Sequence, residues 1–241
     1  MASWHRSRKG VMSEETGGID PSRCWLVIPL YNEAEVVAEV VRAARATFPN
    51  IVCVDDGSTD GSVNAARDGG AIVLEHVVNL GQGAALQTGI DFALTDPAML
   101  AIVTFDADGQ HRVEDALAMV QQLVDDDVDI VIGSRFLDDR TKVSAMKRIV
   151  LRTVTVAQRL STGLRLTDAH NGLRAMTRST ASTIRITQNR MAHASEIVSE
   201  VARLKLRYAE HPVHVLYTDY SKSKGQSLWN SVNILSDMII R

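Results

Sequence analysis

Short apolar runs alternate with segments of helical periodicity along the first part of this 241-residue chain. Each run has the length of a buried strand, and the segments between them repeat apolar residues at the spacing of amphipathic helices. The predicted strands cover residues 24–30, 51–55, 71–75, 101–105 and 129–134. The predicted helices cover 36–44, 62–67, 81–94 and 113–124. This alternation predicts an α/β fold whose central sheet is mostly parallel, with helices on both faces.

The rhythm changes after Phe136, where helical and polar segments dominate. We expect helices over 145–161, 180–185 and 193–204, and short strands over 173–176, 206–210 and 213–217. This second half is expected to cover one edge of the sheet. The whole chain is predicted to comprise a mobile leader (1–22), one α/β domain (23–225) and a C-terminal amphipathic helix (226–241).

Composition narrows the function classes. The net charge of -3 provides no basic field for nucleic acid. The leader lacks the apolar core of a signal peptide, and no run of 18 apolar residues predicts a membrane span. Cys24 and Cys53 lie in apolar runs, which favours buried, reduced thiols over a disulfide. Residues 226–241 contain an apolar stripe at helical spacing, made by Leu228, Val232, Leu235 and Ile239. This stripe favours packing onto the domain or oligomerisation, and a position at the membrane surface stays open.

Two carboxylates, Asp106 and Asp108, directly follow the apolar run 101–105. The carboxyl ends of parallel strands meet at one edge of an open sheet, where ligands bind. Carboxylates at alternate positions there can share a hard divalent cation that keeps room for substrate phosphates. The text Asp-Ala-Asp-Gly is also good turn chemistry, so these residues alone leave a plain turn open.

Six motifs occur in order and together resemble glycosyltransferase family 2, which has the GT-A nucleotide-sugar-binding fold. They are VIPLYNE, VCVDDGSTDG, NLGQGAALQTGI, TFDADGQH, IGSRF and DAHNGLRAM. The sequence is most similar to the branch that contains dolichol-phosphate mannosyltransferases and bacterial polyprenyl-phosphate glycosyltransferases. Two positions depart from the family pattern: Gln82 stands where Lys is frequent, and Leu173 replaces an aromatic residue.

The resemblance implies roles for individual residues. Those expected at the nucleotide are Pro29, Tyr31, Asn32, Glu33, Asp55, Asp106, Ala107 and Asp108. Asp106, Asp108 and Gln110 are expected to hold Mg²⁺ or Mn²⁺. The residues expected at the diphosphate or the acceptor are Arg135, Arg174, Lys222 and Lys224, and those expected to be catalytic are Asp108, Arg135 and Glu196.

Structural alternatives exist for several of these residues. Asn32 could cap the following helix, and Arg174 could form an ion pair with Asp168. Glu196 could complement a helix dipole, and Lys222 and Lys224 could belong to a solvated loop.

The implied activity is inverting, metal-dependent transfer of a hexose from a nucleotide sugar, with UDP preferred over GDP. The acceptor is either polyprenyl phosphate, which needs no base, or a saccharide hydroxyl, for which Glu196, Asp168 or His170 would be the base. A nucleotidyltransferase and a non-catalytic nucleotide-sugar-binding protein are the rival classes. We expect a cytoplasmic protein without nucleic-acid partners, and leave open homo-oligomerisation and peripheral contact with the cytoplasmic membrane face.

Overall fold

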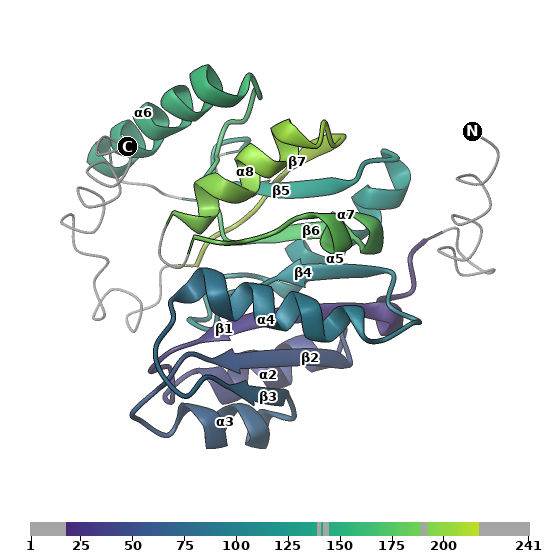
Figure 1. Cartoon of the computed structure of the whole chain (residues 1–241), viewed down its shortest axis with the longest axis vertical. Helices are drawn as coiled ribbons and strands as arrows, with labels where there is room; N and C mark the ends of the chain where they lie inside the picture. Colours follow the sequence, from purple (N-terminus) through teal and green to yellow (C-terminus); the bar gives the residue numbers. More distant parts are fainter. Residues whose placement is uncertain (1–17, 139–140, 142–144, 189–191, 217–241) are drawn as a thin grey trace.

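The computed structural model describes residues 18–138, 141, 145–188 and 192–216, in which a seven-stranded sheet forms the centre (Figure 1). The strands are β1 (Cys24–Leu30), β2 (Asn50–Asp55), β3 (Ile72–Glu75), β4 (Ala101–Thr104), β5 (Ile130–Ser134), β6 (Arg174–Thr177) and β7 (Tyr208–Pro212). Their order across the sheet is β3-β2-β1-β4-β6-β5-β7. The mostly parallel α/β architecture predicted from the alternation is confirmed.

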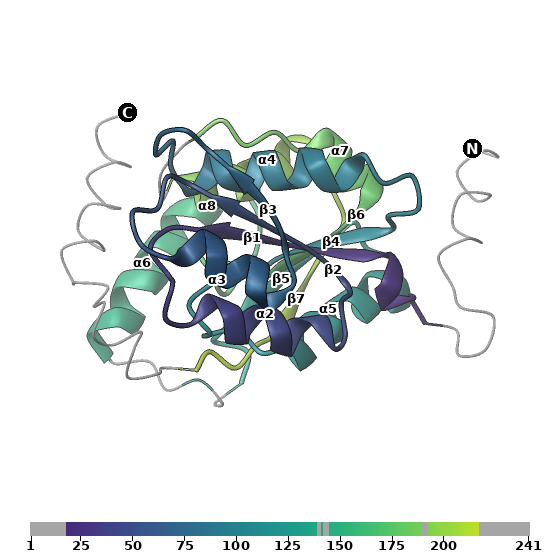
Figure 2. The ribbon, with the colours of Figure 1, turned by 90° about the horizontal axis from the view of Figure 1, so that it is seen from below.

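Helices cover both faces of the sheet (Figure 2). One face carries α2 (Val37–Arg45), α3 (Ser62–Gly69) and α5 (Val113–Asp125), and the other carries α4 (Gln82–Leu94), α7 (Arg178–Thr183) and α8 (His193–Arg203). Each face therefore has its own apolar core, in which strand residues that point to that side pack against the covering helices. The remaining long helix, α6 (Ala145–Thr162), packs against α8.

Strand β6 runs antiparallel to both of its neighbours, β4 and β5. Its first residue, Arg174, pairs with Thr104 near the end of β4 and with Ile132 in β5. Because the neighbours run the other way, the start of β6 lies at the edge where the parallel strands end. This reversal brings a residue from the second half of the chain next to the loop that follows β4.

One predicted strand is wrong: residues 213–216 form no strand. Val213 donates its backbone N–H to Ser134 O, and Leu216 donates to Gln110 O. Val213 and Val215 are buried, so their alternation records packing against the core and not a place in the sheet.

The segments at the two ends of the chain were expected to be a leader and an amphipathic helix. Ile19, within the expected leader, is buried, and its N–H donates to Gln121 Oε1 on α5. Residues 1–17 and the expected helix 226–241 lie outside the described residues. Among the helices that the structure describes, each is too short or too polar to cross a bilayer.

Candidate active site at the carboxyl edge of the sheet

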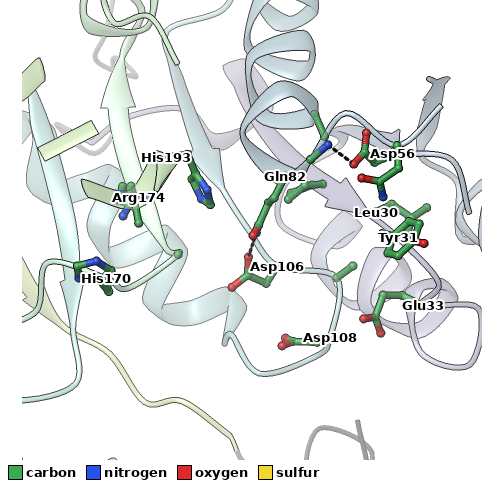
Figure 3. A pocket seen from close by; sticks show the side chains of 17 residues that line it. Leu30, Tyr31, Glu33, Asp56, Gln82, Asp106, Asp108, His170, Arg174 and His193 are labelled. Atoms are coloured by element: carbon green, nitrogen blue, oxygen red, sulfur yellow. Dashed lines mark hydrogen bonds between the residues drawn. The ribbon is translucent and has the colours of Figure 1, made fainter. Parts of the chain in front are cut away.

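A cavity of about 520 Å³ opens at the carboxyl ends of β1, β2 and β4 (Figure 3). Its lining comprises Pro29, Leu30, Tyr31, Glu33, Asp56, Asn79, Gly81, Gln82, Ala85, Asp106, Ala107, Asp108, His170, Gly172, Arg174, His193 and Ala194. In Figure 3, His170, Arg174 and His193 lie on one side of Asp106, and Tyr31 and Glu33 lie on the other. The cavity thus combines a cationic and imidazole side with a carboxylate side.

The loop after β1 is fastened to the loop after β2. Asn32 N donates to Ser58 Oγ at 2.9 Å, and Thr59 N donates to Asn32 Oδ1 at 2.9 Å. Asn32 has φ 54°, a left-handed conformation that asparagine tolerates better than most residues. Since α2 begins only at Val37, the alternative in which Asn32 caps this helix is wrong. Its side chain fixes the relative position of two loops.

The neighbouring carboxylates Asp55 and Asp56 have different environments. Asp56 Oδ1 accepts from Leu80 N at 2.9 Å, and Asp56 Oδ2 accepts from Gly81 N at 2.7 Å. These bonds fasten the turn before α4, where Gly81 has φ 97°. Asp55 Oδ1 is buried and has no hydrogen-bond partner in the described part of the chain. Asp55 therefore keeps an acceptor for a ligand, although Asp55 is not itself among the described residues that line the cavity.

Asp106 is held from two sides. Its Oδ2 lies 2.9 Å from His111 Nε2, and Gln82 Nε2 donates to its Oδ1 at 3.4 Å. Burial alone would raise the pKa of Asp106, but interaction with His111, and with His193 and Arg174 beyond it, lowers the pKa below its usual value. Asp106 is therefore an anion at neutral pH.

Asp108 lies in a less favourable environment for charge. Burial, the Asp106 carboxylate and the more distant Glu33 raise the pKa of Asp108 to about 6. Gln110 N donates to Asp108 Oδ1 at 3.0 Å, and the Gln110 side-chain amide donates to Oδ2. Two carboxylates that repel one another at the edge of a sheet make a place where a divalent cation would be stabilising.

Gly172 leaves the space that the Asp106 carboxylate occupies. A Cβ at residue 172 would lie 2.6 Å from Asp106 Oδ2, closer than real Cβ atoms approach. The glycine that precedes Leu173 thus allows the loop before β6 to pass directly beside this carboxylate.

The Arg174 side chain is fully buried, and the residue lines the cavity. Its Nη2 donates to Ala169 O at 3.5 Å, while its Nε and Nη1 have no partner among the described residues. Burial lowers the pKa of Arg174 to about 10, against the opposing influence of Asp106 and Asp168. The guanidinium is therefore charged at neutral pH and has donors available for an anion.

Asp168 pairs with Arg135, and the alternative ion pair between Asp168 and Arg174 is not formed. Arg135 Nε and Nη2 reach the two carboxylate oxygens at 2.6 and 2.8 Å. Burial would raise the pKa of Asp168, but the Arg135 guanidinium holds it below its usual value. Arg135, which was expected at the diphosphate or acceptor, is not one of the described residues that line the cavity.

His170 and His193 are the imidazoles of the cavity. His170 Nε2 lies 3.1 Å from Ser195 Oγ, and its buried Nδ1 has no partner in the part of the chain described. Burial, and next the charge of Arg174, lower the pKa of His170 to about 4, so its ring is neutral at physiological pH. His193 was not among the residues expected in the site. A histidine at the predicted start of a helix was the only available signal.

The other expected residues lie apart from the cavity or outside the described chain. Glu196 accepts from Thr187 N at 2.9 Å and from Gln188 N at 2.8 Å, which fastens the segment before α8. Within the described ranges it is not a lining residue. Lys222 and Lys224 lie outside the described residues.

The available ligands fit a metal site that protein carboxylates and substrate phosphates form together, rather than one formed by protein side chains alone. In the described residues, no three side chains of His, Cys, Asp or Glu gather around one point. Asp106 and Asp108 nevertheless line one cavity. One or two carboxylates completed by substrate phosphates and water are the usual way in which proteins hold Mg²⁺.

The open sheet and the cavity at its carboxyl edge place the protein among the α/β proteins that bind ligands where their parallel strands end. The family model described as glycosyl transferase family 2 matches residues 25–185, and the chain belongs to this family.

Similar proteins come from archaea and bacteria. An uncharacterized protein of Methanocaldococcus jannaschii is 33% identical over 228 residues, which cover 92% of this chain and 93% of that protein. A UDP-N-acetylglucosamine–dolichyl-phosphate N-acetylglucosaminyltransferase of Methanococcus voltae is 29% identical over 226 residues, 85% of this chain and 90% of that enzyme. An undecaprenyl-phosphate 4-deoxy-4-formamido-L-arabinose transferase of Pseudomonas fluorescens is 29% identical over 88% of this chain, but only 62% of that enzyme is covered.

A solved structure with the same fold is glucosyl-3-phosphoglycerate synthase of Mycobacterium tuberculosis in complex with Mn²⁺ and UDP-glucose. Its TM-score is 0.65 at 18% identity, with 89% of this chain and 78% of that chain covered. At this identity the likeness concerns the fold.

Proposed function

We propose that this glycosyltransferase moves a hexose from a UDP-sugar to polyprenyl phosphate, with inversion at the anomeric carbon, at the cytoplasmic face of the membrane. The named relatives from Methanococcus voltae and Pseudomonas fluorescens act on dolichyl phosphate and undecaprenyl phosphate, which supports the acceptor class. The name of the first also includes a UDP-sugar donor, which supports UDP over GDP.

The observation that carries the proposal is the buried Arg174 guanidinium with two unpartnered nitrogens among the described residues, beside the cavity that Asp106 and Asp108 line. A buried cation without an anionic partner is costly. A phosphate oxygen that accepted from Nε and Nη1 would offset this cost, because guanidinium binds phosphate through paired hydrogen bonds. The cavity therefore suits a substrate phosphate close to Arg174.

Asp106 and Asp108 would hold Mg²⁺ or Mn²⁺, with Gln110 next to Asp108. When bound, the ion neutralises negative charge that grows on the departing nucleoside diphosphate. His111 and Gln82 keep the Asp106 carboxylate in place for this role. Gln82 stands where the family often has lysine, so Arg174 is the described cation best placed to stabilise phosphate charge.

The nucleoside would lie on the other side of the cavity. Pro29, Tyr31 and Glu33 line this side, and the Tyr31 ring is half exposed. Asp55 pairs with Leu30 in the register of β1 and β2, and its unpartnered Oδ1 could accept an N–H of the base or a ribose hydroxyl. Asn32 positions the loop, and Ala107 lies between the two metal-binding carboxylates.

The candidate bases favour a phosphate acceptor. Glu196 accepts hydrogen bonds from backbone N–H groups and is not among the described residues that line the cavity, and Asp168 is paired with Arg135. His170 lines the cavity, but a pKa of about 4 makes it a weak base. A phosphate is already an anion near neutral pH. Its oxygen can attack the anomeric carbon directly while the bond from that carbon to the diphosphate breaks.

The proposal is tested by presenting UDP- and GDP-hexoses to the purified chain with Mg²⁺ or Mn²⁺, using polyprenyl phosphate or free saccharides as acceptors. We expect a glycosyl-phosphopolyprenol from a UDP-sugar, and no such product when EDTA removes the ion. Formation of an oligosaccharide with no lipid product would instead assign a saccharide hydroxyl as the acceptor.

A further inference from the structure

The outward side of α6 combines exposed apolar residues with a basic sequence. Leu160 is 83% exposed and Val156 is 56% exposed, although they lie one helical turn apart on a helix that packs against α8. Arg159, between them in the sequence, is also exposed. Val156 and Leu160 therefore form one apolar patch beside an exposed basic residue.

The charge of α6 contrasts with that of the whole protein. Its sequence, AMKRIVLRTVTVAQRLST, contains Lys147, Arg148, Arg152 and Arg159 and no acidic residue. The complete chain has a net charge of -3. Arg165, three residues beyond the end of the helix at Thr162, is exposed. A helix with exposed apolar residues and only basic charges has the chemistry of helices that lie in the interface of an anionic bilayer.

The opposite side of α6 is joined to the cavity. Val154 and Gln158 are buried, and Gln158 Nε2 donates to Ser195 O at 2.8 Å. Ser195 Oγ is in turn 3.1 Å from Nε2 of His170, a lining residue. Figure 1 shows α6 outside α8, at the end of the molecule toward which β1 points. A surface held by α6 would therefore lie near the edge where the cavity opens.

We propose that the exposed side of α6 docks the protein onto an anionic lipid bilayer, with Val156 and Leu160 inserted among the lipids and Arg159 at the headgroups. This inference rests on the membrane location in the proposed function and deepens it, because it names the side of the enzyme that binds lipid. Burial of the Val156 and Leu160 side chains in the bilayer would favour this binding. Attraction between Arg159 and the anionic headgroups would favour it further.

The test is co-sedimentation of the full chain with vesicles of phosphatidylcholine containing or lacking phosphatidylglycerol. We expect binding only to the anionic vesicles, and weaker binding at high salt. Val156→Ser with Leu160→Ser should lower the partition coefficient about tenfold or more, since burying one such side chain is worth roughly a tenfold change. Arg159→Glu should lower it about fivefold or more.

Ile72→Ser is the matched control, because Ile72 is 45% exposed on the edge strand β3, which Figure 1 shows at the opposite end of the molecule from α6. It should bind vesicles as the natural chain does. Equal vesicle binding by the Val156→Ser, Leu160→Ser variant would overturn the inference. So would loss of binding only on Leu228→Ser with Leu235→Ser, which would assign the contact to the C-terminal segment.

Two further measurements separate membrane docking from catalysis and from self-association. The Val156→Ser, Leu160→Ser variant should retain transfer to a short-chain acceptor in detergent, so that failure of the proposed reaction and failure of membrane docking give different results. Light scattering should show the same oligomeric state for the variant and the natural chain. A dimer lost on Leu160→Ser would identify this side as an interface between copies and would contradict docking on lipid.

Discussion

Arg174 is a residue whose buried charge destabilises the folded chain but suits the binding of an anion. A fully buried guanidinium with two nitrogens unpartnered among the described residues is destabilising unless a ligand accepts from them. Arg135, by contrast, has a bidentate carboxylate partner in Asp168. The two arginines, both expected at phosphate groups, should therefore respond differently to substitution.

Arg174→Gln should lower kcat about 100-fold or more, the usual scale for removal of a group that stabilises developing charge. The free energy of unfolding should change little or increase, because an unpaired buried charge is removed. Steady-state kinetics and urea unfolding measure the two effects. Activity within about threefold of the natural chain would contradict the assignment of Arg174 to substrate phosphate.

Arg135→Gln, unlike Arg174→Gln, should lower the free energy of unfolding. It leaves the buried Asp168 carboxylate without its charged partner, and breaking a buried pair in this way costs about 3 kcal/mol or more. Urea unfolding should show this loss at neutral pH. An unchanged midpoint would mean that Asp168 does not depend on Arg135.

His170 should make stability depend on pH between about 6.5 and 4, because its folded-state pKa is about 4 and its ordinary value is 6.5. Above this window the ring is neutral in both states and contributes nothing. As pH falls through the window, the unfolded state binds the proton first, so stability falls by roughly 3 kcal/mol in total.

The measurement is the difference in unfolding free energy between the natural chain and His170→Gln as a function of pH. The difference should be constant above about pH 7 and should shift in favour of the variant as pH falls from about 6.5 to 4. A difference that stays constant across this window would show that His170 is not buried as a neutral ring.

The sequence predicted some individual residues of the site and missed others for a physical reason. Asp106 and Asp108 follow a strand, so their position at the carboxyl edge could be predicted from the local pattern. The partner of Asp168 could not, since Arg135 lies 33 residues away and either arginine could reach it. His193 lines the cavity because of how α8 packs, and no local sequence pattern indicates that position.

At the scale of elements, spacing predicted where strands and helices occur better than how they pair. The short strand near Arg174 was predicted, but its antiparallel insertion between β4 and β5 depends on long-range pairing. The buried residues Val213 and Val215 alternate as in a strand and yet lie beyond the sheet. Alternation reports burial on one side, and it does not report a hydrogen-bonded neighbour.

The loop before β6 makes a prediction at this scale. Gly172→Ala would place a methyl group 2.6 Å from Asp106 Oδ2, so the carboxylate or the loop must move. We expect the affinity for Mn²⁺ in the presence of UDP to fall about tenfold while the protein stays folded, because a misplaced ligand weakens a metal site. Isothermal titration calorimetry measures this affinity.

Gly61→Ala is the control, since its Cβ would meet only Ala34 Cβ at 3.8 Å, an ordinary contact. Equal Mn²⁺ affinity for Gly172→Ala and Gly61→Ala would show that the close approach of Gly172 to Asp106 has no role in metal binding.

At the scale of the whole molecule, the sequence pattern predicted the architecture because strands and helices in this fold have different patterns of apolar residues. Strands β1, β2, β4 and β5 are mostly apolar and buried, as strands covered on both faces must be, and the helices between them have one apolar side. The cavity then forms where the parallel strands end. The second half contributes Arg174 and His170, which the sequence had suggested as site residues, and His193, which it had not, to the same cavity.

The most direct test of the account is the anomalous diffraction of manganese in crystals of the chain grown with UDP and Mn²⁺. We predict an anomalous peak between the Asp106 and Asp108 side chains, in contact with the diphosphate, and its loss in Asp108→Ala crystals that retain the fold. Ordered UDP in the cavity with no anomalous peak beside these two carboxylates would contradict the account.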